Sequence, residues 1–281
     1  MKTIVITGCT SGFGLETSRR LLAQGHQLIG IARGGKARWM ELLGPEASAT
    51  GRALAYDADL AEAKTVEDAA RKILAENPTV DVLINNAGIG LMGTAEDQDP
   101  EELRRQFEIN FFSAVRLTQI FLPALRKSRG RIISVSSICG IATFPFYGAY
   151  CSSKYALESY MEALRHDLAG SGVQVGLIEP GTFRTEFAGR NFWLGKRSRD
   201  PSSPHFARTQ AFEGFVTRKR LSAPDPDWVV RTMVNWVNQP KIPVRLLIGW
   251  DAKFLGFLKK LLPTQLLFDL TQKGFRAMTR S

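Results

Sequence analysis

The first 24 residues place a short apolar run, a glycine-rich segment and a helical pattern next to one another. Residues 2–7 (Lys-Thr-Ile-Val-Ile-Thr) are typical of a buried strand, and residues 8–14 (Gly-Cys-Thr-Ser-Gly-Phe-Gly) follow directly. Residues 15–24 then have helical spacing. Glycines allow the backbone to approach a pyrophosphate, and the start of a helix supplies free N–H groups. This order predicts a phosphate-binding turn, with an ordinary glycine turn between a strand and a helix as the alternative.

The rest of the chain alternates between strand-like and helix-like patterns. We expect strands near residues 4–7, 27–32, 53–56, 82–85, 131–136, 173–178 and 244–248, separated by helical patterns such as 66–75, 101–125 and 149–168. Such alternation predicts an α/β fold with a doubly wound parallel sheet of seven strands and helices on both faces. Because the carboxyl ends of parallel strands form one edge of a sheet, the motifs that follow these strands are expected to meet in one cleft.

Length and composition are compatible with a single domain that spans residues 1–281. The chain is 44% hydrophobic, which suffices for a full core, and it contains no internal repeat or flexible linker. The first strand begins at residue 2, which leaves no room for a targeting peptide, so the cytoplasm is the expected compartment. The three cysteines and three histidines lack metal-ligand spacing, and no metal site is expected.

Tyr150 and Lys154 lie four positions apart in a helical pattern, so both side chains point to the same side. The ordinary pKa of tyrosine is near ~10. A neighbouring cation favours the phenolate and makes the pair a candidate for acid–base catalysis. An exposed aromatic side chain beside a solvated lysine is the alternative. The surrounding motifs decide between the two interpretations.

Further motifs accompany this pair in a fixed order. They are Thr-Gly-x-x-x-Gly-x-Gly at residues 7–14, Asp59-Leu60, Asn-Asn-Ala-Gly at residues 85–88, Asn110, Ser137, and Pro180-Gly181 before Thr185. With this set the chain resembles the classical short-chain dehydrogenases/reductases over residues 1 to about 188. Residues beyond 188 have only a general similarity to members that act on steroids, retinoids and other apolar alcohols or ketones. The resemblance implies a single-domain Rossmann fold, with residues 1–188 as the cofactor-binding and catalytic core and residues 189–281 as a substrate loop and C-terminal helical lid.

The resemblance also implies a catalytic set of four side chains. Tyr150 is expected to exchange a proton with the substrate oxygen, and Lys154 to lower the pKa of Tyr150 and bind the nicotinamide ribose. Ser137 is expected to donate a hydrogen bond to the substrate oxygen, and Asn110 to hold a water that connects Lys154 to solvent. A turn hydroxyl at a strand end for Ser137 and a helix-bending amide for Asn110 are the alternatives.

A second set of residues is implied to bind the cofactor. NADP(H) is expected rather than NAD(H), because Ala32 stands where NAD-preferring relatives carry aspartate and Arg33 follows it. Arg33 as a solvated cation is the alternative, as is a helix N-cap for Asp59 or Thr185. The expected cofactor-binding residues are Gly8, Thr10, Ser11, Gly12, Phe13, Gly14, Arg33, Asp59, Leu60, Asn86, Ala87, Gly88, Tyr150, Lys154, Pro180, Gly181, Thr182, Phe183 and Thr185.

Residues 189–281 are basic and rich in apolar side chains. Residues 189–220 and 241–281 each carry eight Lys/Arg against two Asp/Glu, and the whole chain has a formal net charge of +10. No nucleic-acid-binding motif accompanies this charge, so nucleic acid is not an expected partner. The aromatic side chains of this region predict an apolar substrate pocket. They are Phe192, Trp193, Phe206, Phe212 and Phe215.

Residues 254–268 alternate apolar clusters with lysines and predict a basic amphipathic helix that is broken at Pro263. They contain no apolar run of the ~20 residues that cross a bilayer. Three uses compete: a lid over the substrate cleft, a peripheral anchor in a membrane surface and a contact between subunits, with the lid preferred. The family resemblance implies a homodimer or homotetramer formed through the helices that carry Asn110 and Tyr150.

Together these patterns predict an NADP(H)-dependent oxidoreductase that interconverts a hydrophobic secondary alcohol and its ketone, with steroid-like, retinoid-like or lipid-like substrates. A 3-oxoacyl reductase is an alternative, because a basic lid could receive an anionic carrier or coenzyme A. A non-catalytic NADP-binding sensor is the alternative from another class. The intact set of Asn110, Ser137, Tyr150 and Lys154 argues against a sensor, which needs no acid.

Overall fold

A parallel sheet of seven strands forms the centre of the computed structural model, which describes residues 1–281 except 46, 48–49, 186–190 and 279–281. The strand order is β3-β2-β1-β4-β6-β7-β9, and every neighbouring pair is parallel. The strands are β1 (Thr3–Thr7), β2 (Gln27–Ala32), β3 (Ala53–Asp57), β4 (Val82–Asn85), β6 (Arg131–Val135), β7 (Gln174–Pro180) and β9 (Arg245–Ile248). The winding direction changes between β1 and β4, and ligands of such sheets bind at this point.

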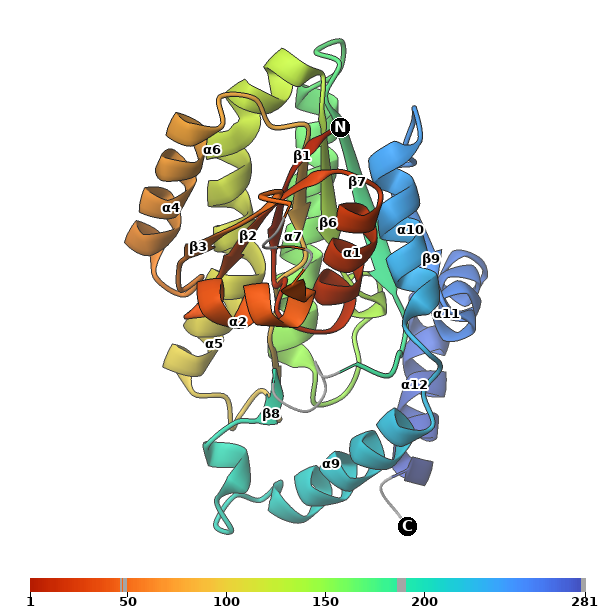
Figure 1. Cartoon of the computed structure of the whole chain (residues 1–281). Helices are drawn as coiled ribbons and strands as arrows, with labels where there is room; N and C mark the ends of the chain where they lie inside the picture. Colours follow the sequence, from red (N-terminus) through yellow and green to blue (C-terminus); the bar gives the residue numbers. More distant parts are fainter. Residues whose placement is uncertain (46, 48–49, 186–190, 279–281) are drawn as a thin grey trace.

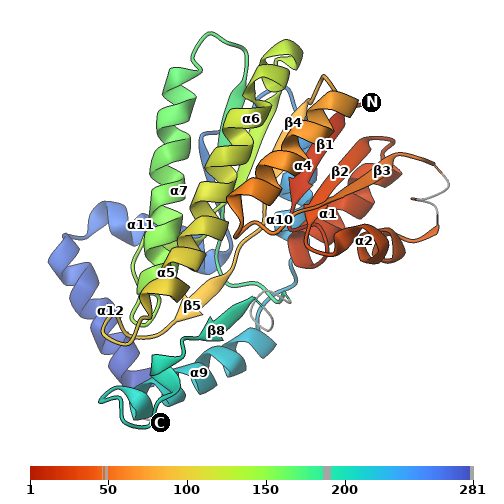
Figure 2. The same ribbon diagram turned by 90° about the vertical axis from the view of Figure 1, so that its left-hand side faces the viewer.

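Alternate residues of β1 contribute to two hydrophobic cores, one on each face of the sheet. Val5 belongs to one core and Ile4 and Ile6 to the other, because successive side chains of a strand point to opposite faces. Figures 1 and 2 show α4, α6 and α7 over one face and α1, α2 and α10 over the other. These helices are α1 (Gly12–Ala23), α2 (Gly35–Leu43), α4 (Ala63–Glu76), α6 (Ser113–Ser128), α7 (Gly148–Asp167) and α10 (Asp227–Asn238).

A π-helical turn, Glu108–Phe112, joins α5 (Pro100–Phe107) to α6. Asp99 caps the start of α5 by accepting a hydrogen bond from the Glu101 N–H at 2.8 Å. The stretch that the sequence predicts as one helix is therefore a helical segment with a local widening. Such widenings recur at functional sites, and this one carries Asn110.

Several elements of the C-terminal third of the chain lie at the carboxyl edge of the sheet. They are β8 (Phe192–Leu194), which pairs in parallel with β5 (Gly90–Met92), and the helices α9 (Phe206–Leu221), α11 (Trp250–Leu261) and α12 (Thr264–Met278). Figure 1 shows β8, α9 and α12 below the strand ends. None of the helices in the described part of the chain combines the length and apolar composition needed to span a bilayer.

The predicted architecture is confirmed, and each main strand begins and ends within two residues of the expected bounds. The break expected at Pro263 separates α11 from α12. The short β5–β8 sheet and helix α2 were not predicted, since three-residue strands have no measurable period. The expected boundary between residues 188 and 189 lies outside the described residues.

Candidate active site

The turn between β1 and α1 depends on glycine. Gly8 and Gly12 have φ values of +65° and +50°, in the left-handed region that strains other residues. A Cβ atom on Gly14 would lie 2.3 Å from the Gly8 carbonyl oxygen, so α1 can approach the turn this closely only because Gly14 lacks a side chain. The turn ends at the N-terminus of α1, where free N–H groups and the helix dipole favour an anion. This cradle fits the pyrophosphate of a dinucleotide.

Side-chain hydrogen bonds connect the end of β1 to the end of β4. The Asn86 amide donates hydrogen bonds to the carbonyl oxygens of Thr7 (3.0 Å) and Gly8 (3.1 Å). The Thr7 hydroxyl accepts from the N–H groups of Asn86 (3.1 Å) and Ala87 (3.0 Å). Asn85 donates to hydroxyl groups on α6 and β6. Asn86 therefore satisfies backbone carbonyl groups at the point where the winding direction changes.

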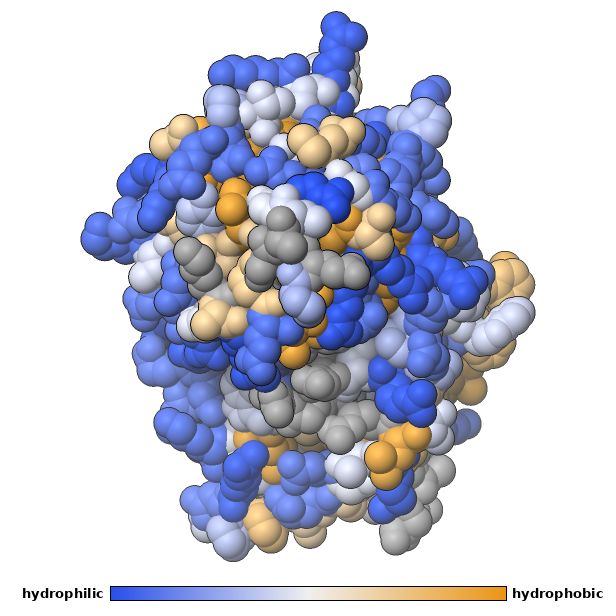
Figure 3. Space-filling model, viewed as in Figure 1, coloured by the Kyte–Doolittle hydropathy of each residue, from blue (hydrophilic) through white to orange (hydrophobic). Residues whose placement is uncertain are grey.

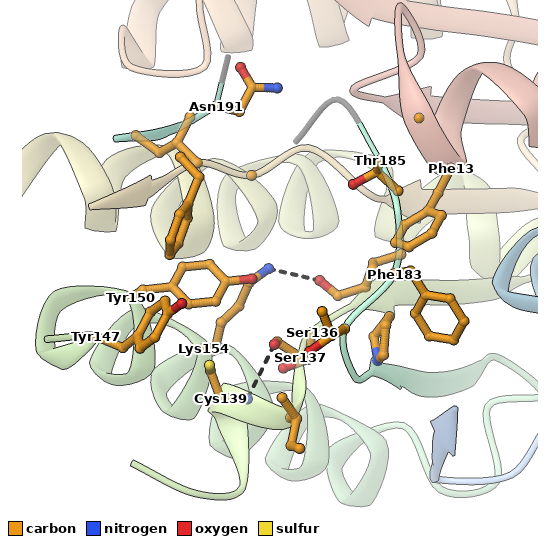
Figure 4. A pocket seen from close by; sticks show the side chains of 18 of the residues that line it. Phe13, Ser136, Ser137, Cys139, Tyr147, Tyr150, Lys154, Phe183, Thr185 and Asn191 are labelled. Atoms are coloured by element: carbon orange, nitrogen blue, oxygen red, sulfur yellow. Dashed lines mark hydrogen bonds between the residues drawn. The ribbon is translucent and has the colours of Figure 1, made fainter. Parts of the chain in front are cut away.

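Helix α7 presents Tyr150 and Lys154 to the same cleft, opposite the loop after β6 that carries Ser137 (Figure 4). The Ser137 hydroxyl interacts with the Tyr150 phenol and acts to lower its pKa. The Lys154 Nζ atom donates to the Val135 carbonyl oxygen at 2.9 Å and lies 5.8 Å from the centre of the Tyr150 ring. Ser137 also accepts from the Cys139 N–H at 3.2 Å, so the predicted turn role and the predicted site position coexist.

Burial dominates the protonation of this pair. It raises the pKa of Tyr150 above the ordinary value of a tyrosine, Cys139 adds to the rise, and the interaction with Ser137 opposes it. Burial also lowers the pKa of Lys154 to about 8, while Glu158 and Cys139 act to raise it. The net shift is upward because desolvation of the phenolate dominates, and the expectation that Lys154 acts to lower the pKa of Tyr150 stays a prediction.

Asn110 lies behind the cavity wall, bonded to the loop that follows β4. Its amide oxygen accepts from the Ile89 N–H at 2.8 Å, and its amide nitrogen donates to the Ile89 carbonyl at 2.9 Å and to the Ser153 hydroxyl at 3.0 Å. No direct hydrogen bond between Asn110 and Lys154 occurs among the described residues. The structure places Asn110 as a bridge between that loop and α7.

One cavity of about 910 Å³ collects most of the predicted residues. Two exceptions are Gly14, which supports the turn from behind, and Asn110. The predicted residues that line it are Gly8, Thr10, Ser11, Gly12, Phe13, Arg33, Asp59, Leu60, Asn86, Ala87, Gly88, Ser137, Tyr150, Lys154, Pro180, Gly181, Thr182, Phe183 and Thr185. Residues scattered over 178 positions of sequence thus form one site, because the sheet aligns its strand ends.

Two arginines lie at the end of the cavity near β2. Arg33 is 64% exposed and contacts an oxygen of Asp59 at 3.5 Å. This contact occupies one of the five N–H groups of the guanidinium. Arg38, on α2, also lines the cavity and was not predicted. The sequence offered one indication of its role: Arg38 follows Arg33 by five positions. The helix that carries Arg38, α2, was not predicted.

Aromatic side chains form the opposite end of the cavity. Of the five predicted there, Phe192, Phe212 and Phe215 line the wall, whereas Trp193 and Phe206 do not. Tyr147 and Phe275 were missed: Phe275 packs against Phe212 at 5.4 Å between ring centres, and Tyr147 lies one helical turn before Tyr150. The wall joins α7, β8, α9 and α12, so it depends on contacts between segments far apart in sequence. It suits an apolar substrate.

The described residues form neither a candidate metal site nor a disulfide bond. No group of three His, Cys, Asp or Glu side chains among them could hold a metal ion. Cys9, Cys139 and Cys151 are buried and unpaired. Burial raises the pKa of Cys9 to about 12, which disfavours a reactive thiolate.

Comparison with known proteins gives a consistent result. A family model described as short chain dehydrogenase matches residues 2–192. A probable short-chain type dehydrogenase/reductase, VdlC of Helicobacter pylori, is 34% identical over 263 residues, covering 92% of this chain and 93% of that protein. Human retinol dehydrogenase 8 is 32% identical over 87% of this chain and 80% of its own length. The 3-ketodihydrosphingosine reductase of Bacteroides thetaiotaomicron is 37% identical over 66% of this chain and 65% of its own length.

Solved structures share the fold. A short-chain dehydrogenase from Streptomyces avermitilis has a TM-score of 0.79 and 30% identity, over 98% of this chain and 97% of that one. Two neighbours at 23% identity were solved with different cofactors. The Burkholderia cenocepacia protein holds NADP (TM-score 0.68, 92% of each chain), and the Burkholderia phymatum protein holds NAD (TM-score 0.77, 92% of this chain and 94% of that one).

Proposed function

The chain belongs to the short-chain dehydrogenases, and from this we propose that it interconverts a hydrophobic secondary alcohol and its ketone with NADP(H) as the cofactor. As a member it is an oxidoreductase. The observation that carries the proposal is that Tyr150, Ser137 and Lys154 line one cavity, which has a glycine-rich turn at one end and an aromatic wall at the other. These residues fit a nicotinamide dinucleotide.

The mechanism follows from the positions of these side chains. When bound, the cofactor supplies or accepts the hydride at the carbon of the alcohol or ketone. Tyr150 donates its proton to the oxygen of the ketone during reduction, and Ser137 donates a hydrogen bond that stabilises the negative charge developing there. The Lys154 ammonium lies beside the phenol and restores its proton after transfer. Oxidation uses the same groups in reverse.

The cofactor preference rests on charge near β2. Ala32 leaves no carboxylate at the position that would bind the ribose hydroxyls of NAD, and Arg33 and Arg38 supply cations for the 2′-phosphate of NADP. Asp59 holds one edge of the Arg33 guanidinium. Charge-assisted hydrogen bonds of this kind are worth about 1.5 to 3 kcal/mol each.

The apolar substrate class rests on the aromatic wall and on two relatives whose names specify retinol and 3-ketodihydrosphingosine. A 3-oxoacyl reductase is the second candidate. Lys219 lines the cavity on the basic helix α9 and would favour the anionic carrier of such a substrate. The two candidates differ in their dependence on this cation: conversion of a neutral ketone does not require Lys219.

The test follows nicotinamide absorbance with NADPH and NADH against neutral ketones of graded size and apolarity and against a 3-oxoacyl thioester. We expect turnover with NADPH that improves with apolar size. Arg33→Ala and Arg38→Ala should each weaken NADPH about tenfold or more and leave NADH nearly unchanged. Arg71→Ala, an exposed arginine on α4 outside the cavity, is the matched control. Equal losses with both cofactors would refute the phosphate assignment.

A further inference from the structure

Helix α11 is amphipathic with its large apolar side chains turned outward. Trp250, Phe254, Phe257 and Leu261 recur at helical spacing, so they form one stripe. Their exposed fractions are 82%, 64%, 59% and 61%. The opposite side of the helix contributes its small residues to the protein: Ala252 is fully buried, and a Cβ on Gly256 would lie 2.4 Å from Leu247. A helix that packs as a simple lid has the reverse arrangement.

Helix α12 continues this surface. Leu266 and Leu270 lie one turn apart on α12, on the same side of that helix, and are exposed by 45% and 46%. In Figure 3 hydrophobic residues are exposed along the right-hand edge of the molecule, where Figure 1 places α11. We call these six exposed side chains the docking face: Trp250, Phe254, Phe257 and Leu261 of α11, with Leu266 and Leu270 of α12. A cluster of exposed apolar side chains of this kind indicates an interaction site.

Lysines border the docking face, whereas its two carboxylates accept hydrogen bonds from the protein. Lys253 and Lys260, two turns apart on α11, border the stripe on one side, and Lys273 of α12 is also exposed. Asp251 accepts hydrogen bonds from the N–H groups of Thr182 and Ala252, and Asp269 accepts from Gln265. The net charge offered around the apolar stripe is therefore positive.

We propose that the docking face binds the surface of an anionic lipid bilayer, with α11 lying in the plane of the interface. The outward Trp, Phe and Leu side chains enter the boundary between head groups and acyl chains, and the lysines contact the anionic head groups. A second copy of the chain is a poorer occupant. A twofold contact through the same stripe would bring the lysines of one copy against those of the other.

The substrate cavity opens on the docking face. Phe254 and Leu270 belong to both, because they line the cavity and are 64% and 46% exposed. Docking would therefore set the cavity mouth against the lipid. This step rests on the proposed function: a ketone dissolved in the bilayer would reach Tyr150 without crossing water.

The test is sedimentation of the full chain with vesicles of phosphatidylcholine alone and of phosphatidylcholine mixed with phosphatidylglycerol. We expect binding to the anionic vesicles that falls as salt is raised. Trp250→Ser and Phe257→Ser, neither of which lines the cavity, should each weaken binding about tenfold. Lys260→Glu should weaken it with no loss of apolar surface. Val244→Ser, an exposed apolar residue at the other end of β9, is the matched control and should bind as the parent does.

Failure of the parent chain to sediment with anionic vesicles would overturn the proposal. So would a stable dimer that Trp250→Ser dissociates, because that result assigns the face to a second copy. Turnover of a small water-soluble ketone by Trp250→Ser reports on the proposed function alone and should equal that of the parent. If Trp250→Ser loses vesicle binding but keeps this turnover, the result supports docking. If the parent shows no turnover, the proposed function is refuted, and the sedimentation result still tests docking.

Discussion

At the scale of single residues, burial decides which form of Tyr150 is ready to react. Its raised pKa keeps the phenol protonated at neutral pH in the cavity described here. A protonated phenol next to the Ser137 hydroxyl is prepared to donate, which is the role required in the reduction of a ketone. The sequence identified the residue, but it could not indicate this environment, because the aromatic wall that desolvates Tyr150 comes from distant segments.

Replacing Tyr150 by phenylalanine tests this assignment. Tyr150→Phe should reduce kcat about 10²- to 10⁴-fold, the usual contribution of a general acid, while NADPH binding changes little. Tyr147→Phe is the matched control, since Tyr147 lines the same cavity and its pKa is also raised by burial. We expect the control to keep kcat within a few-fold of the parent. Steady-state kinetics together with NADPH titration would show this, and near-parental turnover by Tyr150→Phe would exclude the phenol as the acid.

The pH dependence should report on Lys154. Burial lowers its pKa to about 8, so its ammonium is present below this pH and is lost as the pH rises through it. The value of kcat/KM should therefore fall on the alkaline side with a midpoint near 8. Glu158 acts to raise this pKa, so Glu158→Gln should move the alkaline limb to lower pH. Glu162→Gln, one turn further along α7 and 42% exposed, is the control, and a limb that moves equally in both variants would contradict the assignment.

At the scale of elements, the sequence predicts those parts that have a period or a motif. The alternating and apolar runs of β1, β2 and β4 define strands without help from the rest of the fold. The β5–β8 pair has three residues in each strand, and β8 pairs across about 100 residues of sequence, so no local signal exists. Helix propensity likewise cannot predict the π-helical turn at Asn110, because the bonds of that amide to Ile89 form only in the folded chain.

Helix α11 illustrates the same limit. Its amphipathic pattern was predicted as a lid, and the pattern alone left three uses open. The structure shows that its first turn also contacts the cavity loop that follows β7. The Asp251 carboxylate accepts from the Thr182 N–H at 2.8 Å, and a Cβ on Gly181 would lie 1.9 Å from it. The two segments are separated by 69 positions, so only the packed structure brings them together.

Loss of this carboxylate should loosen the loop after β7. Asp251→Ala leaves the Thr182 N–H without its partner, a cost of about 1 kcal/mol or more, and we expect NADPH to bind about fivefold more weakly. Asp269→Ala, which removes an exposed carboxylate from α12, is the control and should bind NADPH as the parent does. Isothermal titration with NADPH measures both. Unchanged affinity in Asp251→Ala would show that the loop holds its position without α11.

At the scale of the whole molecule, the two ends of the cavity are built in different ways. The phosphate-binding end lies on the sheet and its first helix, and its residues are close in sequence to strand ends. The substrate end is assembled from α7, β8, α9, α11 and α12, whose contacts are long-range. The motifs in the sequence therefore predicted most of the first end. For the second they predicted apolar character but only part of the lining, since Tyr147, Phe254 and Phe275 lie on elements that only the folded chain brings together.

We propose the face formed by α6 and α7 as the surface for self-association. Phe112, at the start of α6, is 45% exposed and packs on Phe111, which contacts Tyr160 of α7 at 5.9 Å between ring centres. We expect a homodimer or homotetramer through these helices, and Phe112→Asp should dissociate it, because a buried unpaired carboxylate is strongly unfavourable at an interface. Phe257→Ser serves as the control and should leave the assembly intact. Sedimentation velocity gives the masses, and a monomeric parent chain would refute self-association through this face.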